Sequence, residues 1–439
     1  MFPWKAHVAC LIGSTWCCFV LTEGFGSTGP GFAAISRLDV PHRRCKVAFG
    51  DSGDRSRVSP RMGELKEGDV YWAPELMNGM RYLRLGKSDL VVSEVCLGTM
   101  TWGEQNTDEE AIEQLDCAFD EYGVNFLDAA EMYPVPGRKE TQGRTEIAIG
   151  KWLRRRNRRE VILATKVAGK SVAERLGHLR DSGEGPRVRR KDILEAVDKS
   201  LRRLGTDYID LLQIHWPDRS VPMFSSNMRY DVSMESPDDI PMEEQLAALD
   251  EVVKAGKVRY IGLSNETPYG VSKFVELGER MGYPRVCSVQ NCYNLLARMD
   301  TELNTMAETC SKQQANVGFL AYSPLAGGVL TGKYVDSIPK TSRMTLFGAF
   351  MSRYRNEPST RAVKLYAEAA AEAGMTPTQL ALAWVYSRDF VASTIIGATT
   401  MAQLRENIRA LNCRLPTETS NRINSIYDLS RAPTAVPRA

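Results

Sequence analysis

The sequence has little of what metal sites and disulfide frameworks require. It contains four histidines and ten cysteines in 439 residues, and no two of the cysteines form a Cys-x-x-Cys pair. Zinc sites are built from histidine clusters or closely spaced cysteine pairs, and disulfide scaffolds from regularly spaced cysteines. We therefore expect no metal site, and we expect free thiols in a reducing compartment.

The chain also lacks a strong net charge and a long apolar run. It has 56 Lys and Arg against 54 Asp and Glu, a formal net charge of +2, which gives no reason to expect nucleic acid as a partner. The apolar stretch at residues 8–21 is interrupted and too short to cross a bilayer securely. The sequence thus predicts neither a nucleic-acid partner nor a membrane-embedded mature domain, and it predicts no particular oligomeric state.

The first eighty residues differ from the rest. The apolar stretch is followed by a Ser, Gly and Pro-rich segment and then by basic residues, with Glu23 and Asp39 as the only acids in the first fifty. An apolar segment followed by a basic, acid-poor one is typical of a targeting peptide. We expect residues 1–80 to be an unstructured leader and linker that directs the protein to a plastid, in the chloroplast stroma. The alternative is a disordered leader with no targeting function, on a cytoplasmic protein.

From residue 81 onward, short β-prone apolar runs alternate with helical patterns. The runs are almost continuously apolar, as in parallel strands buried on both faces. Helical patterns cover residues 108–122, 192–204 and 376–386, and the last opens on Thr376-Pro377, an N-cap followed by proline at the first helical position. The eight apolar runs occupy residues 94–98, 125–128, 161–166, 208–215, 258–264, 286–290, 317–322 and 393–397.

Eight such alternations predict an α/β fold, a closed (β/α)8 TIM barrel over residues 81–430 with a short tail at 431–439. An open doubly wound sheet is the alternative. That fold usually carries Gly-x-Gly-x-x-Gly after its first strand. Here the first strand continues into Gly98, Thr99 and Met100 without that pattern, which favours the barrel.

Polar side chains follow the predicted strands where each strand ends. In a barrel of parallel strands these ends meet at one mouth, where active sites lie. Taken singly, each has an ordinary explanation, such as a helix cap for Asp128 or a strand-end lysine for Lys166. Together they converge on one site, and chance is the weaker account. The residues are Asp128, Tyr133, Lys166, His215, Ser264, Asn265, Gln290, Tyr322 and Ser323.

This set of side chains suits the reduction of a carbonyl group. A carbonyl that accepts hydride needs a proton on its oxygen, and a free tyrosine, with a pKa of about 10, donates poorly near neutrality. The ammonium of Lys166 would favour the phenolate of Tyr133 and lower its pKa, and Asp128 would keep that lysine charged and oriented. His215 would donate a hydrogen bond to the carbonyl oxygen as charge develops there.

Over residues 81 to about 430 the chain resembles the aldo-keto reductase family. The order Asp128, Tyr133, Lys166, His215 matches the family's catalytic tetrad, and residues 257–265, Lys-Val-Arg-Tyr-Ile-Gly-Leu-Ser-Asn, are a further specific match. Within the family the chain is most similar to the bacterial Tas-like branch, through residues 215–217 and 396–400.

The resemblance implies NADPH or NADP+ bound without a Rossmann domain. Ser264, Asn265 and Gln290 would hold the carboxamide, and Tyr322 would stack on the nicotinamide ring. Further implied cofactor residues are Gly98, Thr99, Met100 and Asp128 at the first strand ends, Ser323, Pro324, Leu325, Gly327, Lys333 and Arg343 around the phosphates, and Gly397, Thr399, Gln403, Glu406 and Asn407 after the eighth strand.

The resemblance leaves the partner of the 2′-phosphate open between Arg405 and Arg343. A helix N-terminus after the eighth strand would also favour an anion. The chain departs from the family's pattern at residues 134–143, 170–190 and 216–243, where loops above the barrel would choose the carbonyl substrate. The last of these loops offers the apolar residues Met223, Phe224, Met228 and Tyr230.

Two other functions are compatible with parts of the sequence. Channel β-subunits share the family fold and bind the nucleotide with little turnover, but that branch resembles Asn at the position of His215, so a working enzyme is favoured. A Schiff-base aldolase would use Lys166 as its nucleophile, and trapping of a substrate on Lys166 by borohydride would reveal it. The motif set makes the aldolase the weakest of the three.

Overall fold

The computed structural model describes residues 71–72, 79–222, 230–335, 338–339, 342–347, 351–431 and 433–435. Most of the predicted leader, residues 1–70 and 73–78, lies outside the described residues, as do Met223, Phe224 and Met228 of the long loop. None of the helices in the described ranges has the length and apolar content needed to cross a bilayer.

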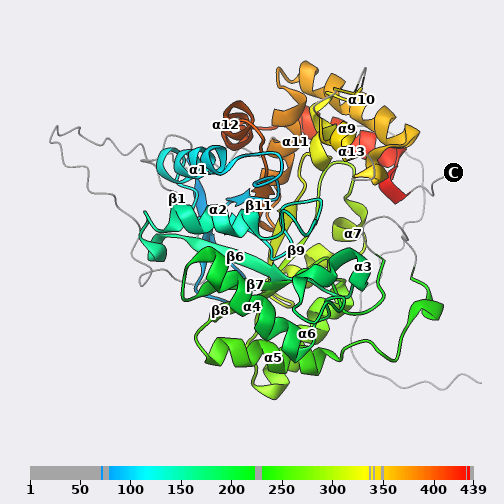
Figure 1. Ribbon diagram of the computed structural model, residues 1–439. Coiled ribbons are helices and arrows are strands. Elements are labelled where there is room, and N and C mark those ends of the chain that lie inside the picture. The colour runs from blue at the N-terminus through cyan, green and yellow to red at the C-terminus, as the bar shows by residue number, and fades with distance from the viewer. Residues whose placement is uncertain are drawn as a thin grey trace, which may run out of the picture. The chain divides into compact units, whose positions relative to one another are not determined.

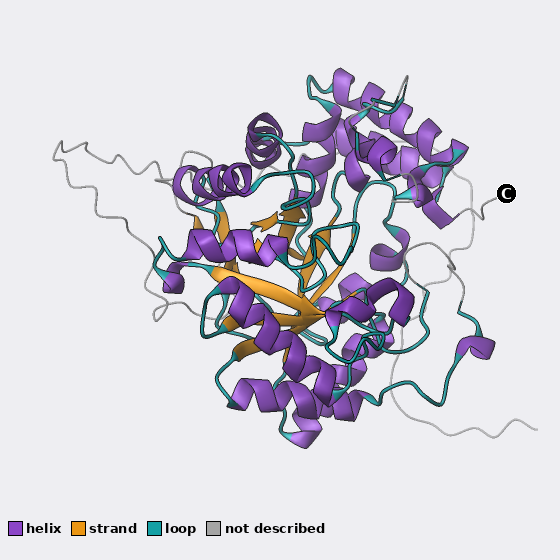
Figure 2. Ribbon diagram, viewed as in Figure 1, coloured by secondary structure: helices purple, strands orange, loops and turns teal. Residues whose placement is uncertain are grey.

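Eight parallel strands form a closed barrel, seen in Figure 2 as the central strands with helices around them. The strands follow one another around the barrel in the order β10-β11-β4-β5-β6-β7-β8-β9, with parallel pairing at every step. The predicted (β/α)8 barrel is confirmed, and the open sheet is not formed. The strands are β4 (Val95–Gly98), β5 (Phe126–Asp128), β6 (Ile162–Val167), β7 (Ile209–Ile214), β8 (Val258–Ser264), β9 (Val286–Cys292), β10 (Gly318–Tyr322) and β11 (Val391–Ile396).

Helices connect the strands and cover the outside of the barrel (Figure 1). The predicted helix at 376–386 begins as expected: the Thr376 side chain accepts a hydrogen bond from the Gln379 N–H, with Pro377 at the first turn. The helix expected over 108–122 is α-helical to Asp116 and continues as a π-helix, Cys117–Glu121. The α-helices are α1 (Asp108–Asp116), α2 (Arg144–Leu153), α3 (Ala173–Leu176), α4 (Arg190–Leu204), α5 (Met242–Lys254), α6 (Pro268–Met281), α7 (Met299–Glu302), α8 (Met306–Cys310), α9 (Arg343–Leu346), α10 (Glu357–Glu372), α11 (Pro377–Tyr386), α12 (Met401–Arg409) and α13 (Thr417–Leu429).

Ahead of β4 the chain forms a small antiparallel sheet that the sequence did not predict. It consists of β1 (Tyr71–Trp72), β2 (Arg81–Arg84) and β3 (Val91–Ser93). The turn between β2 and β3 places Leu85 and Leu90 in one apolar cluster with residues of the barrel interior. Because a Cβ on Gly318, at the start of β10, would lie 2.4 Å from Leu85 Cδ1, this hairpin closes the N-terminal end of the barrel.

The apolar core has two parts that the strand geometry separates. Alternate strand residues, such as Phe126 and Leu211, point into the barrel and join the hairpin. Their neighbours, such as Leu127 and Leu212, point outward and pack in the large cluster between strands and helices. With its interior filled and its N-terminal end closed, the barrel is open to chemistry at the C-terminal ends of its strands.

Candidate active site

A cavity of about 1630 Å³ opens at the C-terminal ends of the strands. Of the two candidates for the 2′-phosphate, Arg343 lines this cavity and Arg405 does not. With one exception, every other residue that the sequence assigned to catalysis or cofactor binding lines it. The exception is Lys166, which is fully buried and contacts two of the lining residues from behind. The predicted site residues are therefore brought together in one place, although they come from strands spread around the whole barrel.

Lys166, on β6, joins the carboxylate of β5 to the tyrosine beyond it. Its Nζ donates to Asp128 Oδ2 at 2.6 Å and to the Ala129 carbonyl at 2.7 Å, and it lies 3.5 Å from the Tyr133 hydroxyl. The Lys166 and Asp128 side chains are 0% and 3% exposed. This buried pair therefore keeps a positive charge beside the phenol.

The Asp128 carboxylate is held from its other side by two amides. Gln213 Nε2 on β7 and Gln290 Nε2 on β9 both donate to Asp128 Oδ1, at 3.1 and 2.8 Å, and Gln290 also donates to Gln213 Oε1. Sequence reasoning missed Gln213, although a buried amide inside an otherwise apolar parallel strand was a readable signal. The network directs Asp128 Oδ2 toward Lys166 and ties Gln290 to the same carboxylate.

Burial and charge act on Tyr133 in opposite directions. Burial raises the pKa of Tyr133, while the nearby charge of Lys166 lowers it, and the net shift is upward from 10. The sequence-based expectation named only the lysine; its effect has the expected sign, but burial outweighs it. With a raised pKa, Tyr133 is neutral at pH 7 and holds the proton that a carbonyl reduction requires.

Lys166 and His215 are both buried, but their charge states differ because the groups around Lys166 offset the effect of burial on its pKa. Burial by itself lowers the pKa of Lys166, but Asp128 and Tyr133 more than offset this, so that its pKa lies above 10.5. Burial, with a smaller contribution from Lys166, holds the pKa of His215 well below 6.5. At pH 7 the site therefore contains an ammonium ion and a neutral imidazole.

His215 lies beside the tyrosine just after β7. The two rings meet edge to face with their centroids 5.8 Å apart, and both side chains line the cavity. Among the described residues, His215 Nδ1 has no hydrogen-bond partner. A neutral imidazole at this place can donate one hydrogen bond to an oxygen that also meets the Tyr133 hydroxyl.

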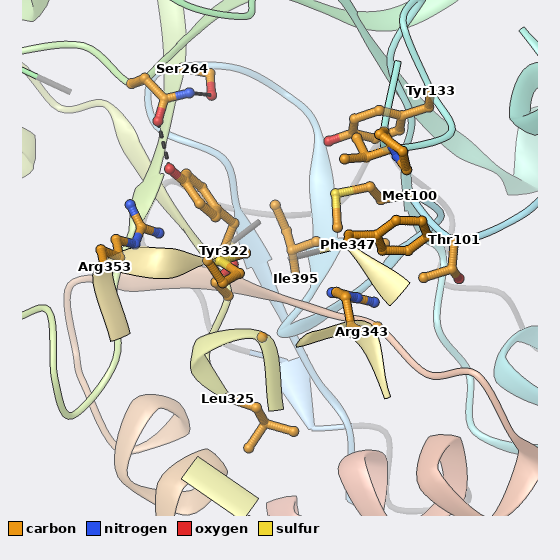
Figure 3. Close-up of a pocket in the computed structure, with 18 of the residues that line it drawn as sticks. Met100, Thr101, Tyr133, Ser264, Tyr322, Leu325, Arg343, Phe347, Arg353 and Ile395 are labelled. Atoms are coloured by element: carbon orange, nitrogen blue, oxygen red, sulfur yellow. Dashed lines mark hydrogen bonds between the residues drawn. The ribbon is translucent and has the colours of Figure 1, made fainter. Parts of the chain in front are cut away.

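Opposite Tyr133, a second group of polar side chains surrounds Tyr322. The Tyr322 hydroxyl donates to Asn265 Oδ1 at 2.6 Å, and Asn265 Nδ2 donates to the His215 carbonyl and to Ser264 Oγ. Figure 3 shows Tyr322 and Tyr133 on different sides of the pocket, with the hydrogen bond of the Tyr322 hydroxyl dashed. These contacts fix the ring of Tyr322 as part of the cavity wall.

The remaining predicted cofactor residues continue the wall away from Tyr133. After β10, residues Ala326, Gly327 and Gly328 have successive φ angles of 51, 67 and 95°, a turn that glycine makes accessible. At the far end, Thr400 caps α12, and Gln403 Oε1 accepts from the backbone and hydroxyl of Thr399. The wall also includes Ser323, Pro324, Leu325, Lys333, Arg343, Gly397, Glu406 and Asn407.

This wall fits a nicotinamide dinucleotide. Gln290 Oε1 accepts no hydrogen bond from the described residues, since both bonds of that amide come from its Nε2, and it is therefore an available acceptor for a carboxamide. A Cβ on Gly397 would meet no atom within 4 Å, so space remains beside α12. The Gly-rich turn, the cations Lys333 and Arg343, and the N-terminus of α12 supply the donors that phosphates require.

The substrate side of the cavity is apolar next to Tyr133. Met132, Val135, Leu176 and Trp216 pack in one cluster with the tyrosine, and all four line the cavity. Val135, Leu176 and Trp216 come from the three loops that the sequence singled out as departures from the family's pattern, whereas Met132 directly precedes Tyr133. Tyr230, from the described part of the longest loop, also lines the cavity.

Comparison with known proteins gives a consistent result. The model of the aldo/keto reductase family matches residues 94–428. The protein Tas of Escherichia coli strain K12 is 43% identical over 356 residues, 81% of this chain and 99% of Tas. L-glyceraldehyde 3-phosphate reductase of the same strain is 33% identical over 348 residues (77% and 90%), and the probable voltage-gated potassium channel subunit beta of Arabidopsis thaliana is 32% identical over 342 residues (76% and 92%). The chain therefore belongs to the aldo/keto reductase family of oxidoreductases.

Proposed function

We propose that the protein uses NADPH to reduce an aldehyde or ketone to an alcohol, with Tyr133 as the proton donor. One observation carries the proposal: a buried lysine, paired with Asp128 at 2.6 Å, lies 3.5 Å from the hydroxyl of a neutral tyrosine that lines the cavity. Family membership supports a nicotinamide cofactor, which supplies the hydride when bound.

The protein's own groups then handle the proton and the charge. The substrate oxygen meets the Tyr133 hydroxyl and a neutral His215, and the Tyr133 proton passes to that oxygen as it gains negative charge. The phenolate left behind is stabilised by the Lys166 ammonium. Because the pKa of His215 lies well below 6.5, His215 orients the oxygen and is a poor proton source at pH 7.

The preference for NADPH over NADH rests on Arg343. Arg343 lines the cavity, and its Nε donates to Gln105 at 3.4 Å. Asn106, the residue after Gln105, donates to the Thr399 carbonyl. Because Thr399 belongs to the predicted adenosine end of the site, these contacts bring Arg343 near that end. The other candidate, Arg405, pairs with Glu121 and is not among the cavity-lining residues. These contacts support Arg343 as the partner of the 2′-phosphate.

A screen of purified protein against aldehydes, ketones and phosphorylated aldehydes tests the proposal, with NADPH and NADH compared as reductants. The phosphorylated members are included because one relative is an L-glyceraldehyde 3-phosphate reductase. We expect NADPH oxidation with at least one carbonyl and near-complete loss in Tyr133→Phe. Unchanged turnover in that variant would remove Tyr133 from the mechanism.

A nucleotide-binding regulatory role is the second candidate, because a relative is a probable channel β-subunit. His215, at the position where that branch resembles Asn, favours turnover. Protein that copurifies with bound nucleotide and oxidises it with none of the carbonyls would support the regulatory role instead.

A further inference from the structure

Behind the loop that carries Tyr133 lies a buried set of charges that the proposed chemistry does not use. Arg180 makes a two-pronged contact with Glu131, with Nη1 to Oε2 at 2.7 Å and Nη2 to Oε1 at 2.9 Å. Its Nε donates to Asp192 Oδ1 at 3.0 Å. The three side chains are each 1% exposed.

Glu131 connects this set to the catalytic loop. It lies two residues before Tyr133, its backbone N–H donates to the Lys166 carbonyl, and its Oε1 accepts from the Ala168 N–H. Its own carbonyl accepts from Gln142 Nε2 at 2.6 Å. Glu131 thus contacts Gln142 at the far end of its own loop. It also contacts the backbone of Lys166 and Ala168, on either side of the last residue of β6.

Arg180 brings a second loop into the same set. It follows a short 3-10 turn, Gly177–Leu179, and its neighbours Leu176 and Leu179 pack in one cluster with Tyr133. Leu176 also lines the cavity. Asp192, on α4, anchors the guanidinium from the outside of the barrel. One arginine therefore links the tyrosine's loop, a wall of the substrate pocket and a helix.

The physical chemistry of such a cluster favours a role in geometry. A buried ion pair is expensive to desolvate and is often no more stabilising than well-packed apolar side chains. A planar guanidinium held by two carboxylates instead fixes direction, because its donors form a rigid fork. Arg180 does not line the cavity, so its influence on the reaction is indirect, and Glu131 is its hydrogen-bonded link to the loop of Tyr133.

We propose that Arg180 is a positioning residue for the reduction, acting through Glu131 to hold the Tyr133 hydroxyl at its place beside Lys166. The inference rests on the proposed function. A misplacement of a catalytic group by about 1 Å can cost on the order of 100-fold in rate. The cofactor wall on the opposite side of the cavity shares none of these contacts and keeps its affinity.

The test compares two arginines of one barrel, each paired with a buried carboxylate. Arg180→Met removes the fork, whereas Arg158→Met removes an ion pair to Asp210 of 2.7 Å, with Asp210 4% exposed, at the N-terminal ends of the strands. We expect kcat to fall at least about tenfold in Arg180→Met, with the NADPH Kd, measured by fluorescence titration, within about twofold of the parent. In Arg158→Met we expect both quantities unchanged.

Glu131→Gln is the second variant and carries the test if Arg180→Met does not fold. It keeps the shape of the side chain and the acceptor for the Ala168 N–H. It should lower kcat in the same direction, again without changing the NADPH Kd. Combined with Tyr133→Phe, neither substitution should lower the residual single-turnover rate further, since residues that act through one group are not additive. Parent-like kcat in the folded variants, or an equal fall in Arg158→Met, overturns the inference. A parent protein inactive on every carbonyl contradicts the proposed function instead.

Discussion

The two ends of the barrel are built from the same eight strands, but one end is closed by apolar side chains and the other is open to a cavity. At the N-terminal end, the hairpin turn buries Leu85 and Leu90 among strand residues such as Phe126 and Leu211. At the C-terminal end, the same strands place Asp128 in the wall of an open cavity and Lys166 directly behind it. The closed end and the open end are separated by strands of only three to seven residues.

The comparison shows how stability and chemistry are separated along a single strand. β6 begins in the apolar interior with Ile162 and carries Lys166 one residue before its end. β7 likewise passes from Leu211 to Gln213, whose amide holds Asp128. Substitutions at the two ends should therefore be distinguishable, with folding affected at one and turnover at the other.

The largest expected effect is on turnover at the C-terminal end. Tyr133→Phe should lower kcat by roughly 10²- to 10⁴-fold, the usual contribution of a positioned proton donor, and leave thermal unfolding nearly unchanged. Tyr366→Phe is the matched control, since that buried hydroxyl donates to the Leu295 carbonyl and Tyr366 does not line the cavity. Steady-state NADPH oxidation measures both. A comparable loss of kcat in the control would show that the assay reports folding.

The next effect is on stability at the N-terminal end. Leu85→Ala should lower the free energy of unfolding by about 2–5 kcal/mol, because it leaves a cavity in a fully buried cluster. We expect the NADPH Kd and kcat of the folded variant to stay within twofold of the parent. Chemical denaturation and a cofactor titration on the same preparation check this. A large change in kcat would mean that the two ends are coupled.

A smaller effect tests the far side of the open end. Arg343→Gln should weaken NADPH binding by roughly 10- to 100-fold, as expected for the loss of one charge-assisted contact, about 1.5–3 kcal/mol. NADH, which has no 2′-phosphate, should bind nearly as before. Arg405→Gln is the control, because that residue pairs with Glu121. The reverse ranking of the two variants in a fluorescence titration would assign the phosphate to Arg405.

The smallest effect is the pH dependence of stability that His215 contributes at the open end. The pKa of His215 is depressed well below 6.5 by burial, so below pH 6.5 the unfolded chain takes up a proton that the folded chain does not. Stability is therefore complete above pH 6.5 and falls as the pH decreases, by at most about 1.4 kcal/mol per pH unit. His215→Gln should show a shallower slope between pH 7 and 5 in denaturation curves. Parallel slopes would contradict the assignment.

The sequence predicted what depends on local pattern and missed what depends on packing. The eight strands were found because both faces of each are buried, which leaves continuous apolar runs. The hairpin was missed because β2 and β3 have four and three residues, too few for any periodicity. Arg180 lies in a charged loop whose sequence alone indicates a solvent-exposed segment. Its contact with Glu131 depends on the fold. The upward shift in the pKa of Tyr133 likewise depends on burial, which the linear order of Asp128, Tyr133 and Lys166 does not contain.

The hairpin that closes the barrel also sets how far the chain can be shortened from its beginning. Met80 is fully buried in the large core cluster, and Arg81 of β2 holds Glu94 with Nε to Oε2 at 2.7 Å. A truncation that ends before Met80 leaves these contacts whole, whereas one that continues through β2 removes part of the floor of the barrel. The position of Met80 therefore sets the shortest chain that still closes the N-terminal end of the barrel.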